Sequence, residues 1–362
     1  MITTPASTVP DALPALAARA DASYLDFVEG LRGYILGTGA SFESRLSQAA
    51  EAEVARRGAA FATVEDIRQF FEALPLVHLR NRLTRTQQEM KWSKLSASYA
   101  ARREQLLAEL GAWDERGPAR LELDPEFVHP PYTNVHFHLQ PGGYHKDELG
   151  GFLYHYGTKV FFRGDNDKDE LHDKLVGSVA PPADGQVRRI LDFACSMGQS
   201  TTAFKARFPQ ADVVGIDHSA AMLRAAHRRA SMLGSDVSFV QRLVEDTRMP
   251  ANHFDIVFAF IVFHELPQRV ARAAVAEALR VLRPGGVFAI YDFNGTESQS
   301  PYQRYHRYFD ARHNGEPYSQ DFCDCDLTAI LQSAGFTVPK AAALPDRAGG
   351  PGYMKHWYAV KA

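Results

Sequence analysis

The chain has 362 residues, of which 45% are hydrophobic and 23% are charged, and its formal net charge is -3. This length exceeds one typical domain, so we expect two domains or one core with a large attachment. The near-neutral charge gives no electrostatic reason to expect nucleic acid or a membrane surface as a partner. The sequence shows no apolar run long enough for a membrane helix, no convincing signal peptide and only three cysteines, so we expect a cytoplasmic protein.

The N-terminal half divides into stretches of different character. Residues 1–20 are rich in Ala, Pro and Thr and are predicted to be flexible. From about 22 to 112, apolar residues recur at three-to-four spacing, which predicts helices. Residues 120–175 are rich in aromatics, histidines and Gly/Pro turns, and their short alternations are typical of strands. We therefore predict an N-terminal domain over 21–178, helical first and aromatic-rich later, which helps to enclose a ligand.

After a linker at about 178–186, the pattern becomes a regular alternation of strands and helices. The predicted strands read VRRILDFA, ADVVGID, VSFVQ, FDIVFAFIVF and VFAIYDF, and the C-terminal HWYAVKA is one more strand at the end of the sheet. The alternation predicts an α/β fold with a doubly wound, mostly parallel, Rossmann-like sheet that has helices on both faces. We assign this core to residues 181–362, with the N-terminal part as its extension.

Residues 190–201, ILDFACSMGQST, form the first predicted strand, loop and helix of this sheet. Such folds bind nucleotide-like ligands there, and small residues let the backbone approach the ligand closely. Asp217 ends the second strand about twenty residues later, where an acid can accept ribose hydroxyls. The loop has one glycine instead of a full pyrophosphate fingerprint. Asp192 would repel phosphates, but it suits a ligand that carries an ammonium group.

Four segments resemble class I S-adenosylmethionine (SAM)-dependent methyltransferases, in particular the group that includes ubiquinone and menaquinone biosynthesis enzymes. ILDFACSMGQST is similar to motif I, VVGIDHSAAML to motif II, FDIVFAFIVFHELP to motif IV and VLRPGGVFAIYDF to the strand-5 motif, and together they cover about 187–340. The resemblance implies that SAM is the cofactor, that the motif I loop surrounds its methionine moiety and that Asp217 holds its ribose. The implied cofactor-binding residues are Asp192, Ala194, Cys195, Ser196, Gly198, Asp217, His218, Met222, Val244, Glu245 and Phe260.

Two positions depart from the family pattern. Ala194 and Ser196 stand where the family has glycines, and these are the next-smallest side chains. The aspartate that usually contacts adenine falls on Leu243. Either Glu245 or Asp246 therefore takes that contact through a shifted loop, or the adenine is held by backbone and stacking alone.

Methyl transfer requires a positioned nucleophile and, for a hydroxyl or a protonated amine, removal of a proton. His264 in FHELP is expected beside the transferred methyl group, and His138 and Tyr144 are the other candidate catalytic residues. Tyr302, Tyr305 and Phe309 lie at helical spacing after the fifth strand, which indicates a lid over the acceptor or ordinary packing. The predicted substrate-binding residues are His136, His138, Tyr154, Tyr156, His264 and Tyr305.

The segment HFHLQPGGYHKDE groups three histidines. Strand-like alternation would place His136 and His138 on one face, with His145 after a turn, and metal sites use such spacing. Histidines among aromatics more often line a ligand site or pack as hydrogen-bonded walls. We therefore expect no bound metal.

The sequence thus predicts an enzyme that transfers a methyl group from SAM to an O, N or S atom of a small molecule. Two alternatives stay open, namely an enzyme of this fold that uses SAM or a histidine-bound metal for another reaction, and a non-enzymatic binding protein. We predict that residues 120–175 cover the cofactor cleft, with a homodimer interface as the alternative. The sequence does not identify the acceptor.

Overall fold

The computed structural model describes residues 14–37, 42–164, 166–293, 295–296, 299–339 and 354–362. Residues 1–13, most of the predicted flexible N-terminus, lie outside the described residues. Across the described ranges, no helix combines the length and the apolar character that crossing a membrane requires.

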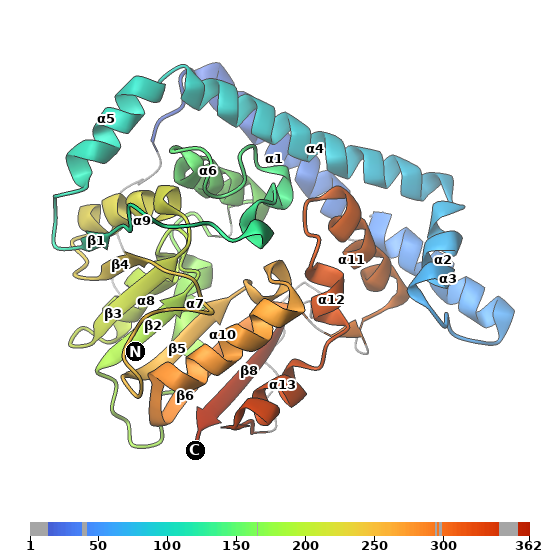
Figure 1. The fold of residues 1–362 in the computed structure, drawn as a ribbon. Helices are drawn as coiled ribbons and strands as arrows, with labels where there is room; N and C mark the ends of the chain where they lie inside the picture. Colours follow the sequence, from blue (N-terminus) through green and yellow to red (C-terminus); the bar gives the residue numbers. More distant parts are fainter. Residues whose placement is uncertain (1–13, 38–41, 165, 294, 297–298, 340–353) are drawn as a thin grey trace, which may run out of the picture.

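An eight-stranded sheet forms the centre of the molecule (Figure 1). Its strands are β1 (Arg120–Glu122), β2 (Arg189–Phe193), β3 (Asp212–Asp217), β4 (Ser238–Gln241), β5 (Phe254–Phe260), β6 (Leu282–Phe293), β7 (Phe336–Thr337) and β8 (Met354–Lys361). Their order is β1-β4-β3-β2-β5-β6-β8-β7. Strands β1 to β6 are parallel, whereas β8 runs antiparallel to both β6 and β7. The prediction of a doubly wound, mostly parallel sheet is confirmed, although β8 lies second from the edge.

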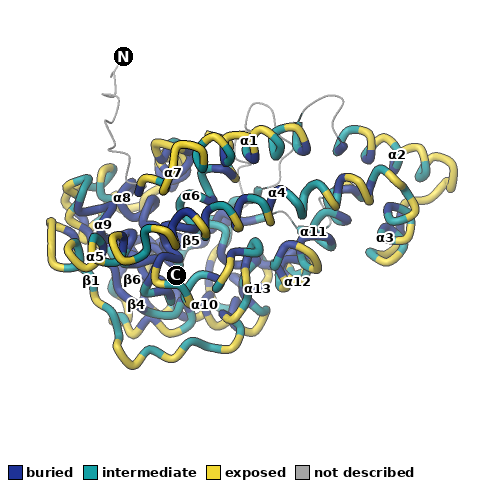
Figure 2. The backbone as a smooth tube through the Cα atoms, turned by 90° about the horizontal axis from the view of Figure 1, so that it is seen from above, coloured by how far each residue is buried: buried dark blue, intermediate teal, exposed yellow. Residues whose placement is uncertain are grey.

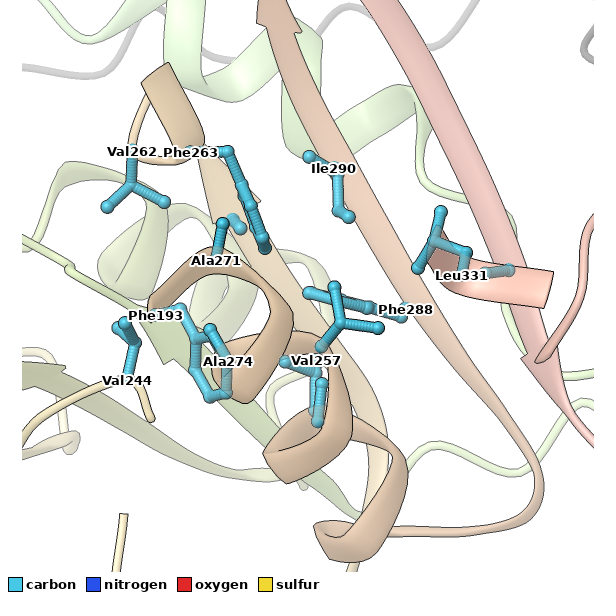
Figure 3. Packing of buried hydrophobic residues seen from close by; sticks show 14 of the residues in the cluster. Phe193, Val244, Val257, Val262, Phe263, Ala271, Ala274, Phe288, Ile290 and Leu331 are labelled. Atoms are coloured by element: carbon cyan, nitrogen blue, oxygen red, sulfur yellow. The ribbon is translucent and has the colours of Figure 1, made fainter. Parts of the chain in front are cut away.

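Helices cover both faces of the sheet, each burying an apolar cluster. One face packs against α7 (Glu170–Ser178), α8 (Gln199–Arg207) and α9 (Ala220–Met232). The other face packs against α10 (Gln268–Val281) and α13 (Leu327–Ala334). Figure 3 shows this second cluster, in which Ala271 and Ala274 of α10 let the helix lie close to the aromatic rings of the strands. The buried core holds the carboxyl ends of β2, β3 and β5 in fixed positions.

Long helices from the N-terminal part extend beyond the sheet (Figures 1 and 2). They are α1 (Arg19–Leu36), α2 (Phe42–Arg57), α3 (Val64–Glu72), α4 (Pro75–Ala100) and α5 (Arg103–Trp113). From the C-terminal part, α11 (Pro301–His313) packs against α2 and α3, and α12 (Ser319–Cys323) follows it. Tyr302, Tyr305 and Phe309 of α11 are buried, the first two in the cluster with α2 and α3, so α11 is a packed helix and not the suggested lid.

Residues 120–175 differ from the strand-like expectation. Apart from the three residues of β1, the described part of this segment holds short 3-10 turns, η1 (Pro131–Thr133) and η2 (Phe137–Leu139), followed by α6 (Gly150–Phe162) and the start of α7. The aromatic and β-branched residues of α6 are tolerated in a helix because α4 and α9 bury it from two sides. A Cβ at Gly151 would lie 2.5 Å from the carbonyl oxygen of Ala221 in α9, so glycine permits the close packing.

The two predicted domains interlock in the structure. β1 from the N-terminal part forms the edge of the sheet beside β4, and α11 from the C-terminal part completes the N-terminal helical layer. The predicted domain boundary at about residue 180 therefore stays a prediction about which parts of the chain fold together.

Candidate active site

A cavity lies at the carboxyl ends of β2, β3 and β5, where parallel sheets of this kind bind ligands. The sheet side supplies the loop after β2, Asp217 and the segment after β5. The N-terminal part closes the cavity with side chains from η1, η2, α6 and the turns between them. The covering residues include Tyr132, Phe137, His138, Tyr144, Tyr154, Thr158 and Phe162. The structure therefore places the 120–175 segment over the cleft, as predicted, while the roles of its side chains stay predictions.

The loop after β2 has the backbone of a glycine-rich loop but only one glycine. Ala194, Ser196 and Gly198 have φ values of 49°, 49° and 69°, which is the left-handed region. A non-glycine residue there is strained by roughly 1–2 kcal/mol, so small side chains reduce crowding but do not remove the strain. At Gly198 a Cβ would lie 2.6 Å from the ring of Phe239, and only glycine fits. The single glycine thus occupies the position where no side chain has room.

Two buried carboxylates face this cavity. Asp217 accepts hydrogen bonds from the backbone N–H groups of Ser196 at 3.1 Å and Ser219 at 2.8 Å, which joins the loop to the end of β3. Asp192 accepts one from the hydroxyl of Thr201 at 2.6 Å. Burial raises the pKa of Asp192 to about 7 and that of Asp217 to about 6. Neither has a cationic partner in the described part of the chain, so the site suits a ligand that brings positive charge.

A second polar cluster lies on the covering side. The Tyr144 hydroxyl donates to Glu265 Oε1 at 2.9 Å, and His138 Nε2 lies 3.3 Å from the same oxygen. His138 Nδ1 lies 3.1 Å from Glu316 Oε1. Burial by itself lowers the pKa of His138, but the two carboxylates raise it to about 10 overall. The two carboxylates therefore favour the charged imidazolium form of His138, which disfavours His138 as a general base.

The backbone that carries His138 is strained. His138 and Leu139 have φ values of 52° and 62°, and the indole N–H of Trp92 donates to the carbonyl of His138 at 2.6 Å. Strained backbone persists where surrounding structure enforces it, commonly at ligand sites. His136 and His138 accordingly do not lie on one strand face, which corrects the sequence expectation.

Most predicted site residues line the cavity, but six do not. Those that line it are His138, Tyr144, Tyr154, Asp192, Ala194, Cys195, Ser196, Asp217, His218, Met222, Val244 and Phe260. Those outside its lining are His136, Tyr156, Gly198, Glu245, His264 and Tyr305. Gly198 shapes the loop, Glu245 Oε1 accepts from the Tyr132 hydroxyl at 2.6 Å, and Tyr305 is buried and accepts from the side-chain amide of Asn81. Asp246 is also absent from the lining, so the lining includes neither of the two acids suggested for the adenine contact, and that contact stays a prediction.

His264 requires a specific correction. It is 2% exposed, and its Nδ1 lies 2.7 Å from Asp292 Oδ1 behind the cavity wall. The 3-10 helix η3 (Phe263–Glu265) turns the next residue, Glu265, into the cavity instead. Nothing in the sequence FHELP tells which of these two adjacent polar side chains faces the cavity. His264 thus orders the end of β5 through Asp292.

Comparison with known proteins identifies the core. Residues 190–286 match the family described as methyltransferase domain. A trans-aconitate 2-methyltransferase from Azoarcus sp. is 40% identical over 103 residues, which are 28% of this chain and 37% of that protein. A demethylmenaquinone methyltransferase from Thermus thermophilus is 35% identical over 109 residues, 29% of this chain and 47% of that protein. The chain carries a class I SAM-dependent methyltransferase domain.

The matched region is only part of each protein, because this chain spans less than half the length of these two curated relatives. The crystal structure of magnesium protoporphyrin IX methyltransferase from Synechocystis with bound SAM has a TM-score of 0.39 and 18% identity, covering 56% of this chain and 84% of that one. A likeness at that level adds nothing about function.

The residues of the methyltransferase domain fit SAM, the cofactor of this class. The left-handed loop brings backbone N–H groups and small side chains to the cavity, and Asp217 is fixed by two backbone donors. The buried carboxylates of Asp192 and Asp217 lack positive charge nearby, which a sulfonium ligand with an ammonium group supplies.

The structure assembles a histidine group that differs from the predicted one. His129, His145 and His218 offer nitrogen atoms within 4.8 Å of one another, and the Nδ1 atoms of His129 and His218 are 3.3 Å apart. The rings of His129 and His145 stack, with centroids 3.9 Å apart and an interplanar angle of 21°. Ring-nitrogen lone pairs lie in the ring plane, so two nearly parallel rings cannot both direct them at one ion.

We therefore expect the methyltransferase domain to work without a tightly bound transition metal. Elemental analysis of protein purified without chelators should give far less than one equivalent of zinc, iron, nickel or copper. A stoichiometric metal, together with activity that disappears on chelation and returns with the metal, would contradict this expectation.

Proposed function

We propose that this protein transfers a methyl group from SAM to an O, N or S atom of a small-molecule acceptor. The observation that carries the proposal is one cavity lined by two chemically different groups of side chains. The first group is the cation-accepting carboxylates Asp192 and Asp217, and the second, at the acceptor end as we propose it, is Tyr144, His138 and Glu265. Small-molecule acceptors also agree with the names of the relatives, one acting on trans-aconitate and one on demethylmenaquinone.

SAM supplies an activated methyl group, so the protein's task is to position the acceptor, to exclude water and to remove a proton where needed. The aromatic rings of Tyr144 and Tyr154 meet edge-on with centroids 5.4 Å apart and form an apolar wall beside the motif I loop. Glu265 is the carboxylate placed to take the acceptor's proton. The Tyr144 hydroxyl donates to Glu265, and His138 forms an ion pair with the same carboxylate, which together fix its orientation.

Calorimetry with SAM and with S-adenosylhomocysteine tests the cofactor part of the proposal, and methyl transfer from isotope-labelled SAM to a panel of small acids, phenols and amines tests the reaction. SAM binding without any transfer would favour a binding protein. SAM consumption without a methylated product would favour another SAM-dependent reaction.

The affinity for SAM should depend on pH through the two buried carboxylates. Their pKa values of about 7 and about 6 lie above the ordinary 3.8, so the folded protein holds these protons more tightly than the unfolded chain does. The two neutral carboxyls therefore add to the free energy of unfolding below pH 4, and this addition is lost as the pH rises through 6 and 7. A cationic ligand binds the ionised form, so its affinity should rise at least about tenfold between pH 5.5 and 7.5. Calorimetry across that range checks this, and Asp192→Asn should flatten the profile. A flat wild-type profile would contradict the assignment.

Replacement of Glu265 by Gln should separate proton removal from binding. We expect Glu265→Gln to lower kcat about 100-fold or more for a hydroxyl or amine acceptor, the usual contribution of a general base, while the affinity for SAM changes little. His264→Gln is the matched comparison, because it alters the adjacent residue outside the cavity. Equal losses in both variants would mean that the segment acts only through its fold.

A further inference from the structure

Helix α4 carries a polar face in the interior of the protein. Arg80, Thr84, Gln87, Gln88 and Lys91 recur at three-to-four spacing and so lie along one side of the helix. The exposed fractions of Arg80, Gln87, Gln88 and Lys91 are 1%, 1%, 2% and 3%. Figure 2 shows α4 running between α1 and α11. A helix face packed in this way is ordinarily apolar, because burying polar groups is costly unless they are paired.

Much of this face has no partner in the described part of the protein. Both side-chain amide atoms of Gln87 are buried without a hydrogen bond, as are Gln88 Oε1, Thr84 Oγ1 and Arg80 Nη2. A buried polar group left unsatisfied costs about 1–3 kcal/mol, so several on one face call for an occupant that supplies polar atoms.

The face also carries one basic group, Lys91, that no carboxylate balances. The Lys91 ammonium lies 4.1 Å from the centroid of the Trp92 ring, and no acid of the described residues forms an ion pair with Lys91 or Arg80. Burial lowers the pKa of Lys91 well below its ordinary range, and the nearby Arg32 lowers it further. Arg32 of α1, which packs on α4, is repelled by Arg163 and Arg80 and attracted by the buried carboxylates of Asp310 and Glu316, and Arg80 also interacts with Asp310. Lys91 is therefore the basic group of this face on which no acid acts, and a ligand with an anionic group would supply the missing partner.

A continuous chain of polar contacts joins this face to the cofactor cavity. Gln88 Nε2 donates to Asn314 Oδ1 at 3.1 Å, and Asn314 Nδ2 donates to Glu316 Oε1 at 3.3 Å. The same Glu316 oxygen lies 3.1 Å from His138 Nδ1, and His138 Nε2 lies 3.3 Å from Glu265 Oε1 at the cavity. The polar face therefore lies directly behind the acceptor end of the site.

We propose that the polar face of α4 binds the anionic end of the acceptor, a small molecule that carries a carboxylate or phosphate group. Lys91 is the principal contact, because its helix neighbour Trp92 donates to the carbonyl of His138 and so places this end of the face nearest the cavity. The unpartnered side-chain Nε2 of Gln87 supplies a neutral donor, and the nucleophilic end of the acceptor lies beside Glu265. This inference rests on the proposed methyl transfer and adds the charge class of its acceptor.

The test uses citrate and inorganic phosphate as probe anions on the full chain, with and without S-adenosylhomocysteine. Calorimetry measures their affinity and thermal unfolding measures the shift in Tm, both at constant ionic strength balanced with sodium chloride. The variants are Lys91→Met, which keeps the volume and removes the charge, and Arg82→Met, which removes an exposed charge from the same helix. General salt effects on stability act on all three proteins equally.

We expect at least one probe to bind the wild type and to raise its Tm by a few degrees at saturation. Lys91→Met should lower the affinity for that probe at least tenfold and abolish the shift in Tm that the probe causes. Without any probe, this variant should unfold at a higher temperature than the wild type, because an uncompensated buried basic group is gone. Arg82→Met should behave as the wild type. Should Lys91→Met fail to fold, Gln87→Leu provides the same comparison.

Absence of binding by both probes in the wild type, or equal affinity in the wild type and Lys91→Met, overturns the inference. S-adenosylhomocysteine binding is measured in the same samples. Normal binding of S-adenosylhomocysteine with no anion site would reject only this inference, whereas failure to bind S-adenosylhomocysteine would reject the proposed methyl transfer.

Discussion

Gly198→Ala is expected to destabilise the protein by about 2–4 kcal/mol and to abolish SAM binding. The added Cβ would lie 2.6 and 2.7 Å from two ring atoms of Phe239, which is fully buried in β4, and φ at this position is +69°. Overpacking of a core by this much costs about 1–3 kcal/mol, and a left-handed alanine adds about 1 kcal/mol. Denaturant unfolding gives the stability and calorimetry gives the affinity.

Ala194→Gly is the matched control for this prediction, because it introduces glycine at a neighbouring left-handed position where a side chain already fits. Glycine relieves the backbone strain of the folded loop, but it also has greater freedom in the unfolded chain. The free energy of unfolding should therefore change by no more than about 1 kcal/mol. If Gly198→Ala were as stable as the wild type, the loop would have to adopt a different backbone from the one described.

Asp217→Ala is expected to weaken SAM binding by about 1.5–3 kcal/mol, roughly 10- to 150-fold, which is the range for loss of charge-assisted hydrogen bonds. The effect has two sources, because this carboxylate is the predicted ribose contact and also holds the N–H groups of Ser196 and Ser219. Asp217→Asn keeps one acceptor oxygen, so it should lose less affinity for SAM than Asp217→Ala does. Calorimetry on folded variants measures both.

Asp246→Ala provides the control for the ribose assignment, because this exposed acid lies near the cavity but outside its lining. The affinity of the Asp246→Ala variant for SAM should equal that of the wild type. Unchanged affinity in a folded Asp217→Ala variant would remove the ribose assignment, and a loss of affinity in Asp246→Ala would favour an adenine contact through Asp246.

The sequence by itself determined the features that depend on local pattern. The alternation from residue 187 onward predicts the parallel sheet, and the acid, small residues and glycine of residues 190–201 predict a ligand loop. These signals are readable because strand and helix periods, and the backbone freedom of glycine, are properties of neighbouring residues. The aromatic content of residues 120–175 likewise indicated a cover over the cleft, since such a segment needs a surface to bury it.

Only the tertiary structure decided which side chains meet. The geometry of η3 directs Glu265 into the cavity and leaves His264 outside its lining. The raised pKa of His138 arises from Glu265 and Glu316, which are both remote from it in sequence. α6 is helical despite its strand-like composition because α4 and α9 bury it on two sides. The polar side of α4 is an ordinary solvated face in sequence terms. It becomes a candidate anion site because α1 and α11 cover it, and long-range packing of that kind leaves no local pattern to read.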